Sequence, residues 1–232
     1  MGDTNQYQFV VDHQKQLVGP FLEIGSHDYG NTQDFRSLFP GEAYVGVDLK
    51  EGPGVDLTLD LTLPFDAIDK ALEGRRFATI FSFSVMEHCE NPFLMAENMT
   101  RLLEPGGRIV LSVPFAWAFH GYPSDYWRFT QEGVKKLFPR LDWNTTESGR
   151  WHSPEKGDFR TIDDSLGTVS LSGKHYREQG QILRGIGADI LKILRMLGLF
   201  RWLPGYHYLI LPTMIDMIGV LENENDAPLN RK

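Results

Sequence analysis

Short apolar runs alternate with helical patterns through the first half of the chain, and this alternation restricts the fold more than any other feature. Four of the five runs are almost continuously apolar, as in strands that are covered on both faces of a sheet. Strands joined through helices make right-handed crossovers, so the pattern predicts a parallel, doubly wound α/β sheet. The predicted strands are residues 20–25, 43–48, 55–59, 78–84 and 107–113, and the predicted helices are residues 6–17, 29–39, 65–72 and 92–103.

The second half of the chain is less regular. A helix is predicted at 130–138, because Thr130 can cap its first turn and Glu132 favours the positive end of the helix dipole. The segments after it show, in order, alternation typical of an edge strand, a polar stretch rich in Gly and Ser, a helical apolar stripe, a second apolar run and a polar end. These predict an edge strand at 141–147, a loop at 148–177, a helix at 181–199, a last strand at 212–221 and a frayed tail over the final ten residues.

Composition and charge exclude several classes of protein. The chain has 232 residues, of which 41% are hydrophobic, so it can bury a core and is neither disordered nor fibrous. Asp and Glu number 31 against 23 Lys and Arg, a net charge of −8 that argues against a nucleic-acid partner. The excess lies in residues 1–116, with 8 basic and 17 acidic side chains, whereas residues 117–232 have 15 and 14. The acidity therefore belongs to the predicted sheet.

The cysteine content and the lengths of the apolar runs indicate where in the cell the protein is located. Cys89 is the only cysteine, which excludes an intramolecular disulfide and a zinc site built from cysteines. The first residues lack the basic stretch and apolar run of a signal peptide. No uncharged apolar run reaches the ~18 residues that a membrane span needs. We therefore expect a cytoplasmic chain.

A glycine turn follows the first predicted strand, and an acid ends the second. Gly25 and Gly30 fit the first and third positions of G-x-G-x-x-G, but His27 stands at the second. Backbone must approach a pyrophosphate closely at that position, so His27 disfavours NAD or FAD more than a nucleoside without phosphates. Glu23 precedes the turn, and Asp48 can accept both hydroxyls of a ribose. Each feature alone also fits an ordinary loop, but together they favour a nucleoside site.

Five segments of the chain resemble class I S-adenosylmethionine-dependent methyltransferases, in the group that includes ubiquinone and small-molecule methyltransferases. They are FLEIGSHDYG, YVGVDL, LDLTLPFD, FSFSVMEHCENP and LLEPGGRIVLSVPF, and they cover roughly residues 18–140. The last two are the most specific, because EH, NP and L-PGG recur at this spacing. The resemblance implies a Rossmann-like, doubly wound, mostly parallel seven-stranded sheet with an antiparallel last strand. It also implies one domain, residues 1–232, with a cofactor-binding core at 18–140. Residues 141–232 would form an acceptor-side cap with a loop insertion, the last strands and a C-terminal helical cap.

The resemblance implies S-adenosyl-L-methionine as the cofactor and names residues that would bind it. The turn residues would contact its amino-acid part, the acid after the second strand its ribose, and Asp60 with Leu61 its adenine. Residues after the fourth strand would lie against its methionine end. His27 departs from the glycine that the family usually has in the turn. The expected cofactor-binding residues are Glu23, Gly25, Ser26, Asp48, Leu49, Asp60, Leu61, Ser82, Ser84 and Val85.

Two stretches would meet the acceptor: the end of the fourth strand, and an aromatic segment at 114–128. Aromatic faces with a few polar groups suit a sugar or polyol. A hydroxyl acceptor must lose its proton, for which His120 is the first candidate base and His88 the second. The alternative to substrate contact is a structural role, in which the aromatic residues pack within the loop and Asp125 and Arg128 form an ion pair. The candidate substrate contacts are Glu87, Tyr122, Asp125, Tyr126, Trp127 and Arg128.

The function that follows is transfer of a methyl group from S-adenosylmethionine to a small molecule, with an oxygen of a sugar or secondary metabolite as the favoured acceptor. The alternatives are N- or C-methylation and a non-catalytic S-adenosylmethionine-binding protein, while an NAD-dependent oxidoreductase is disfavoured by His27. A divalent metal on Asp125, His120 and Glu87 is conceivable, but no ligand spacing demands one. We predict no metal.

The C-terminal half contains one strongly amphipathic stretch. Residues 174–201 include six Lys and Arg against two acids, next to the apolar stripe of the predicted helix. The segment 181–203 could therefore lie on a membrane surface. The alternatives are a helix that covers the substrate pocket and a homodimer face.

Overall fold

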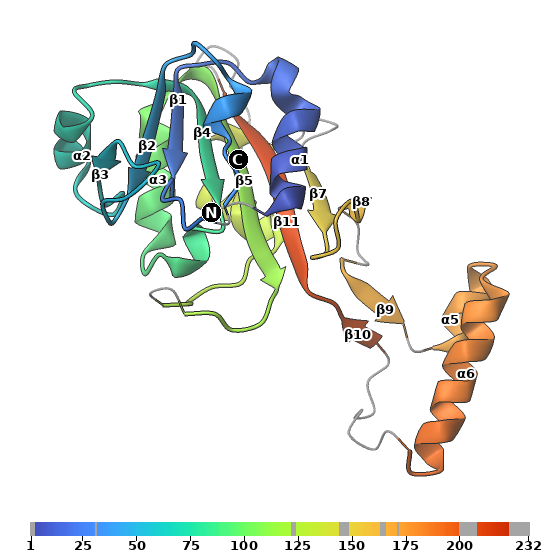
Figure 1. The fold of residues 1–232 in the computed structure, drawn as a ribbon. Coiled ribbons are helices and arrows are strands. Elements are labelled where there is room, and N and C mark those ends of the chain that lie inside the picture. The colour runs from blue at the N-terminus through green and yellow to red at the C-terminus, as the bar shows by residue number, and fades with distance from the viewer. Residues whose placement is uncertain are drawn as a thin grey trace, which may run out of the picture.

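A large twisted sheet organises the chain in the computed structural model (Figure 1). The structure describes residues 3–30, 32–121, 124–143, 149–162, 166–170, 172–199 and 208–222. Nine strands of the described residues form this sheet, in the order β3-β2-β1-β4-β5-β11-β7-β8, with β6 also paired to β11. The strands are β1 (Phe21–Ile24), β2 (Tyr44–Asp48), β3 (Leu57–Thr58), β4 (Phe77–Phe83), β5 (Leu103–Ala116), β6 (Leu141–Asp142), β7 (Gly149–His152), β8 (Phe159–Thr161) and β11 (Thr213–Leu221).

The helices lie on both faces of this sheet or beyond its edge. Those near the sheet are α1 (Thr4–His13), α2 (Phe65–Ala71), α3 (Pro92–Leu102) and α4 (Gln131–Leu137). Short 3-10 turns, η1 (Gln14–Gln16), η2 (Arg36–Leu38) and η3 (Met86–His88), connect elements. Thr130 caps α4 as expected, since its side chain accepts the backbone N–H of Gly133.

The strand directions confirm the predicted doubly wound sheet. β1 pairs in parallel with both β2 and β4, and β4 pairs in parallel with β5. β11 runs antiparallel to β5 over most of its length, from Thr213 to Val220. The mostly parallel sheet with an antiparallel last strand is therefore confirmed, although it has two more strands than the expected seven.

The loop predicted at 148–177 is wrong. Its described parts contain β7, β8, the short strand β9 (Thr168–Ser170) and the helix α5 (Gly173–Glu178). β7 pairs with β11, and Trp151 and His152 are buried there. The polar, Gly-rich composition concealed these strands, of which β7 places Trp151 and His152 in the interior. Of the expected edge strand at 141–147, Leu141 and Asp142 form β6, while 144–147 and the final ten residues lie outside the described residues.

The helix predicted at 29–39 is also wrong, because its described residues form only the η2 turn. Short polar side chains bond to nearby backbone and hydroxyls instead. Asp28 Oδ1 accepts from the Gly30 N–H and the Thr32 hydroxyl, and Asp34 Oδ1 accepts from the Ser37 N–H. Such local bonds compete with helical ones. The crossover between β1 and β2 is therefore largely irregular.

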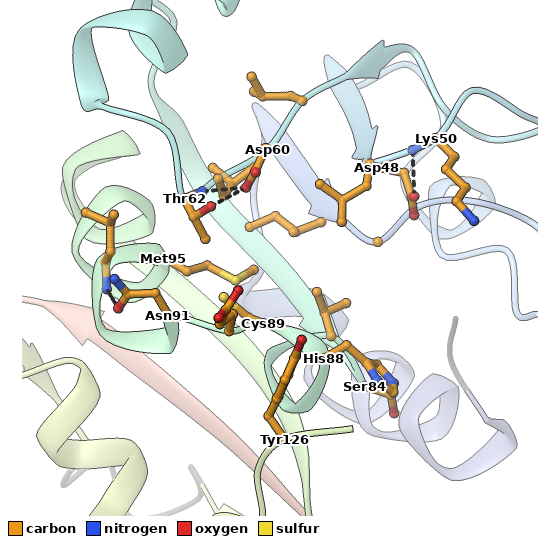
Figure 2. Close-up of a pocket in the computed structure, with 18 of the residues that line it drawn as sticks. Asp48, Lys50, Asp60, Thr62, Ser84, His88, Cys89, Asn91, Met95 and Tyr126 are labelled. Carbon is orange, nitrogen blue, oxygen red and sulfur yellow. Dashed lines mark hydrogen bonds between the residues drawn. The ribbon is translucent and has the colours of Figure 1, made fainter. Parts of the chain in front are cut away.

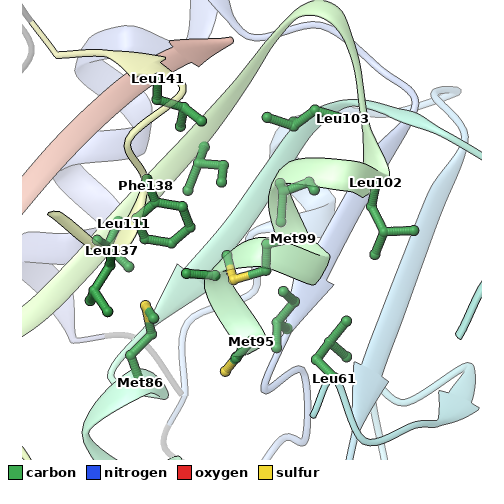
Figure 3. Close-up of a cluster of buried hydrophobic side chains, with 14 of the residues drawn as sticks. Leu61, Met86, Met95, Met99, Leu102, Leu103, Leu111, Leu137, Phe138 and Leu141 are labelled. Atoms are coloured by element: carbon green, nitrogen blue, oxygen red, sulfur yellow. The ribbon is translucent and has the colours of Figure 1, made fainter. Parts of the chain in front are cut away.

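The core lies on both faces of the sheet, as the alternation of side chains along a strand requires. On one face, an aromatic cluster beneath α1 includes Phe21, Phe81 and Phe83. The Phe21 and Phe81 rings stack at 5.7 Å between centroids. On the other face, aliphatic residues of the sheet pack with buried methionines and leucines of α3 and with Phe138 after α4 (Figure 3). The two layers hold the carboxyl ends of the parallel strands in fixed positions.

The helix predicted at 181–199 is present as α6 (Ile182–Met196), which packs against α5. Figure 1 shows this pair standing apart from the sheet, connected through β9 and its antiparallel partner β10 (Tyr208–Ile210). The expected C-terminal helix thus does not cap the sheet in this structure, because the β9–β10 ribbon extends beyond the sheet edge. Within the described residues, every helix is too short or too polar to traverse a bilayer.

Candidate active site

A cavity of about 730 Å³ opens where β1, β2 and β4 end (Figure 2). The strand order places β1 between β2 and β4, so the chain leaves β1 and β4 in different directions and a crevice forms between the crossovers. Open α/β sheets bind ligands at such points. The lining residues are Ile24, Gly25, Tyr29, Asp48, Leu49, Lys50, Leu59, Asp60, Leu61, Thr62, Ser84, Val85, His88, Cys89, Glu90, Asn91, Leu94, Met95 and Tyr126.

Seven of the ten expected cofactor-binding residues line this cavity. They are Gly25, Asp48, Leu49, Asp60, Leu61, Ser84 and Val85. Sequence reasoning missed the N-terminal end of α3, including Asn91, Leu94 and Met95. The Asn-Pro start signal located that helix end, but nothing in the sequence placed it beside the glycine turn.

Gly25 begins the turn after β1 in the left-handed region, with φ +79°. A Cβ at this position would collide with the Val85 side chain across the cavity edge. Only glycine satisfies both the backbone conformation and the close approach. The first glycine of the turn thus brings the ends of β1 and β4 together.

Two carboxylates are oriented by short local bonds on the other wall. Asp48 Oδ1 accepts the Lys50 N–H at 3.1 Å, and Asp60 Oδ1 accepts both the N–H and the hydroxyl of Thr62 at 2.8 and 2.7 Å. Asp48 Oδ2 also accepts the His27 N–H, at a longer 3.4 Å. The arrangement suits a ligand with hydroxyl or amine donors above an apolar floor.

His27 packs beside the cavity rather than within its lining. Its ring stacks on Tyr29 with 4.4 Å between centroids, and a Cβ on Gly52 would collide with the same ring. The histidine at the second position of the turn is therefore packed between Tyr29 and the backbone at Gly52. This leaves the first glycine and the cavity free of its side chain.

Glu23, Ser26 and Ser82 do not line the cavity. The Tyr44 hydroxyl donates to Glu23 Oε2 at 2.7 Å, and burial raises the pKa of the Glu23 carboxyl. The hydroxyl oxygens of Ser26 and Ser82 are buried and have no hydrogen-bond partner among the described residues. Glu23 and Ser82 are buried within the strands β1 and β4, and Ser26 is buried in the turn after β1.

Ser84 marks a special backbone position at the end of β4. Its φ is +52°, which is rare for a residue other than glycine and costs free energy. The Gln6 amide of α1 donates to both the Ser84 and Ser112 hydroxyls at 2.9 Å. The first helix of the chain therefore fixes the strained turn that leads from β4 into the cavity wall.

The turn after β4 and the loop after β5 meet beside the cavity. The Glu87 carbonyl accepts the backbone N–H of Tyr126 at 2.8 Å, and the Trp127 indole donates to the Cys89 carbonyl at 2.8 Å. Tyr126 is half exposed and lines the cavity, whereas Trp127 is bound to the wall from outside. Tyr122 lies outside the described residues.

The same loop is fixed by an ion pair. The Arg128 guanidinium donates to both oxygens of Asp125 at 2.5 and 2.7 Å, and also to the Trp117 and Ala118 carbonyls. These Arg128 hydrogen bonds hold the pKa of Asp125 well below its usual range. Asp125 further accepts the His120 N–H at 2.9 Å. Asp125 and Arg128 therefore position the loop through an ion pair, which was the alternative to a role in substrate contact.

Three candidate residues come together at the junction of these segments. His88 lines the cavity, and the His120 ring lies edge-on to it at 4.9 Å. Glu87 is 1% exposed, with Oε1 at 4.0 Å from His120 Nε2, and burial raises the pKa of its carboxyl to about 8. Burial lowers the pKa of His88. Of the two candidate bases, His88 reaches the cavity directly, and His120 lies behind His88.

Comparisons with known proteins address the fold. The chain is similar to a Burkholderia thailandensis 1,6-didemethyltoxoflavin-N1-methyltransferase solved with its substrate and S-adenosylhomocysteine, at TM-score 0.50 and 12% identity over 94% of this chain and 77% of that one. It is also similar to a S-adenosylmethionine-dependent methyltransferase from Archaeoglobus fulgidus, at TM-score 0.50 and 14% identity over 94% and 95%. This is the class I methyltransferase fold.

A Bacillus halodurans protein considered a methyltransferase shares the same fold, at TM-score 0.52 and 11% identity over 96% of this chain and all of that one. No protein-family model matches the chain, and no curated protein matches it. At identities this low, the similarity to these structures shows the shared fold alone. The fold expected from the resemblance is confirmed.

Proposed function

We propose that the chain is an enzyme that transfers a methyl group from S-adenosylmethionine to a small-molecule acceptor. The observation that supports this most is the convergence of Gly25, Asp48 and Asp60 on one cavity in a methyltransferase fold. The ligand is a sulfonium cation, which the acidic first half of the chain favours. The enzyme's main task is to align the acceptor, the methyl carbon and the sulfur.

The cofactor assignment follows the cavity wall. Asp48 and Leu49 would hold the ribose, Asp60 and Leu61 the adenine, and the Ser84 turn the methionine end. The proposal depends on residues that line the cavity. Glu23, Ser26 and Ser82, expected from the resemblance, would act only by supporting it.

An oxygen acceptor is supported by the histidines. A hydroxyl must lose its proton as the new bond forms, and His88 exposes to the cavity an imidazole that burial keeps neutral. Tyr126, half exposed in the lining, offers an aromatic face for a sugar or secondary metabolite. Nitrogen is the second candidate, because the similar Burkholderia enzyme is named an N1-methyltransferase.

Removal of one carboxylate tests the cofactor assignment. Asp48→Ala should weaken S-adenosylmethionine binding ~100-fold, because two charge-assisted hydrogen bonds of about 1.5 kcal/mol each would be lost. Isothermal titration calorimetry measures this, with Asp66→Ala, an exposed acid on α2, as the matched control. Equal affinity of the Asp48 variant and the control would disprove the assignment.

Removal of a histidine tests catalysis. His88→Ala, which removes the imidazole that reaches the cavity, should keep cofactor affinity while turnover falls ~100-fold or more, and His120→Ala tests the ring behind it in the same way. Transfer of a tritiated methyl group into a metabolite extract measures turnover before the acceptor is known. Cofactor binding by the unsubstituted chain without any methyl transfer would instead indicate a non-catalytic cofactor-binding protein.

A second part of the proposal concerns α6. Its apolar face is exposed along the whole helix, and the exposed apolar residues are Ile182, Leu183, Ile186, Ile190, Ile193, Met196 and Leu197. Buried Gly185 faces Gly173 and Arg177 of α5, so packing in the pair leaves the apolar face uncovered. An exposed apolar surface of this length marks an interaction site.

Charge favours an anionic membrane surface as the partner of this face. Residues 172–199 contain five Lys and Arg against two acids, in a chain of net charge −8. Two copies of this positive segment would repel each other, whereas anionic lipid attracts it. We therefore favour peripheral membrane contact through 181–203 over a homodimer, and a cytoplasmic location stays a prediction.

Vesicle co-sedimentation tests this contact. The protein should pellet with phosphatidylserine-containing vesicles and less so in high salt, because screening weakens charge attraction. Leu183→Glu with Ile190→Glu should abolish pelleting, and Val18→Glu, at an exposed apolar residue away from α6, should not. Failure to pellet, with dimers seen in sedimentation equilibrium, would assign the face to self-association.

A further inference from the structure

Glu87, His88 and His120 form a cluster at the acceptor side of the cavity that the methyltransferase fold does not account for. The η3 turn supplies Glu87 and His88 directly after β4, and the loop after β5 returns to supply His120. One ligating atom from each of the three lies within 4.8 Å of the others. No ligand spacing in the sequence indicated this, because His120 is far along the chain from the other two.

The hydrogen bonds assign the free nitrogen of each ring. His88 Nδ1 lies 2.5 Å from the Ser124 carbonyl, which can only accept, so Nδ1 carries the proton. His120 Nδ1 lies 3.1 Å from the Ala118 carbonyl and 3.4 Å from Asp125 Oδ2, so it too is the donor. Both Nε2 atoms therefore keep a lone pair.

This pattern is typical of metal-binding histidines. A ligating imidazole almost always donates its other N–H to a carbonyl or carboxylate, which fixes the ring and its tautomer. Asp125 serves His120 in this way and is itself fixed by Arg128. Two positioned lone pairs beside one carboxylate make a donor set of two nitrogens and one oxygen.

Two atoms of the cluster lack partners although they are buried. His88 Nε2 and Glu87 Oε2 make no hydrogen bond to the described residues. A buried polar atom without a partner is costly, and Glu87 is almost completely buried. A cation between the three side chains would satisfy both atoms and offset the burial of the carboxylate.

The cluster has room to close around an ion. Atoms bound at ~2.1 Å to one tetrahedral ion lie about 3.4 Å apart, so the side chains must approach each other by roughly an ångström. The His120 side chain is 37% exposed and can make that movement, which also leaves a path for entry. The remaining coordination positions would face the cavity beside His88.

We propose that Glu87, His88 and His120 bind a divalent transition-metal ion of the Zn²⁺ or Mn²⁺ class at the acceptor side of the cavity. Imidazole nitrogens favour Zn²⁺ most, and the carboxylate also suits Mn²⁺, whereas Mg²⁺ prefers a set of oxygen ligands alone. This site replaces the Asp125, His120 and Glu87 set considered from the sequence, and it revises the prediction of no metal. Asp125 acts behind His120 instead of binding the ion.

The site deepens the proposed function and rests on it only for the identity of the acceptor. With its Nε2 lone pair bound to the ion, His88 would hold the ion instead of acting as the base. A hydroxyl bound to a divalent ion would have a lowered pKa and could release its proton to water. The oxygen then donates an electron pair to the methyl carbon while the carbon–sulfur pair returns to sulfur, which leaves S-adenosylhomocysteine. The open positions beside His88 would hold that oxygen against the methyl group.

Metal binding is measured without the cofactor, so that it stands apart from the proposed reaction. The full chain, stripped with EDTA, should bind one equivalent of Zn²⁺ or Mn²⁺ in isothermal titration calorimetry and bind Mg²⁺ far more weakly. His120→Ala and Glu87→Gln should each lower the affinity by ~100-fold or more, since the effect of a ligand exceeds the 10- to 100-fold effect of a supporting group. His175→Ala, an exposed histidine on α5, is the matched control and should retain full binding.

S-adenosylmethionine affinity of the same variants separates the two proposals. Lost metal binding with unchanged cofactor affinity supports the site, and restoration of methyl transfer by Mn²⁺ or Zn²⁺ after EDTA links it to catalysis. If Glu87→Gln does not fold, the half-exposed His120→Ala carries the test. Zn²⁺ binding that is absent, or equal in His120→Ala and His175→Ala, would overturn the site even if the cofactor binds.

Discussion

The sheet and the α5–α6 pair use apolar residues in opposite ways. In β4, Phe81 is fully buried among aromatic rings from β1, β2 and the segment around η2. In α6, the apolar face is open, and Leu183 is 85% exposed. The hydrophobic pattern of the first region is satisfied within the chain, whereas that of the second requires something outside it. Two regions with similar apolar content thus differ in whether they stabilise the fold.

Charged groups divide in the same way. Asp125 with Arg128, and His152 with Asp216, are pairs with a buried carboxylate that fix a loop or a strand. In the α5–α6 pair, the Arg177–Asp189 ion pair is exposed to solvent and contributes little to stability. Electrostatics therefore holds the first region together and leaves the second available for binding.

The largest expected effect is the loss of an aromatic ring from the sheet. Phe81→Ala should lower the free energy of unfolding by about 3–5 kcal/mol, because a large cavity would open in the aromatic layer. Urea unfolding followed by circular dichroism measures the change. A loss below about 1 kcal/mol would mean that this layer is not the tightly packed core described.

Next comes the pH dependence of stability at the buried pair on β7 and β11. Burial alone would lower the pKa of His152. Contacts with Asp216 at 2.7 Å and Asp3 at 3.2 Å outweigh burial and raise this pKa to about 9. The unfolded pKa is ~6.5, so the stabilisation is complete below that pH and is lost as pH rises through 9. We expect a loss of about 3 kcal/mol between pH 6.5 and 9.5.

Chemical unfolding at several pH values tests this expectation. His152→Gln, which cannot be protonated, should flatten the profile over that range. Arg150, which also faces Asp216 from β7, stays charged throughout and cannot produce the change. An unchanged profile in the variant would assign the dependence to other groups.

A smaller effect is expected at the glycine turn, where two positions make a matched pair. Gly25 and Gly30 both have positive φ, but only a Cβ on Gly25 meets another side chain, that of Val85. Gly30→Ala should therefore cost about 1 kcal/mol from backbone strain alone, and Gly25→Ala about 2–3 kcal/mol. Equal losses in thermal unfolding would show that the contact with Val85 is unimportant.

The smallest effect is expected on α6. Ile190→Ala should change the free energy of unfolding by less than about 0.5 kcal/mol, because Ile190 is 52% exposed and packs on no core. The same urea measurement as for Phe81 provides the comparison. A loss of 2 kcal/mol or more would reveal that the apolar face is already covered in solution.

Alternation and strand-end acids were sufficient to predict the parallel sheet and most of the cavity wall. Asp48 and Asp60 end up in the lining because carboxyl ends of parallel strands share one edge, a rule that needs no tertiary information. The segment at 29–39 was mispredicted because Asp28 and Asp34 bond to local backbone and hydroxyl groups, which apolar spacing does not register. Patterns within short segments therefore predicted the strands and the acids at their ends, which depend on local geometry.

The acceptor side could not be predicted in the same way. Glu87 looks like a surface acid in the sequence, and its burial depends on the loop that returns from β5. His88 and His120 become neighbours only through that loop and its Asp125–Arg128 pair. Trp151 and His152 likewise find their places only when β11 arrives beside β7. These contacts depend on long-range packing that no spacing in the sequence records.

The contact between Asp3 and His152 has a consequence for how the chain is made. Asp3 caps α1 and also contacts His152, which contacts Asp216 in turn. A ribosome produces Asp3 long before Asp216, so the first turn of α1 lacks these two partners until β7 and β11 have been made. The apolar side of α1, Phe9 and Val10, can pack on β1 and β4 by the middle of synthesis, so the helix docks first by its apolar face and is fixed at its first turn last.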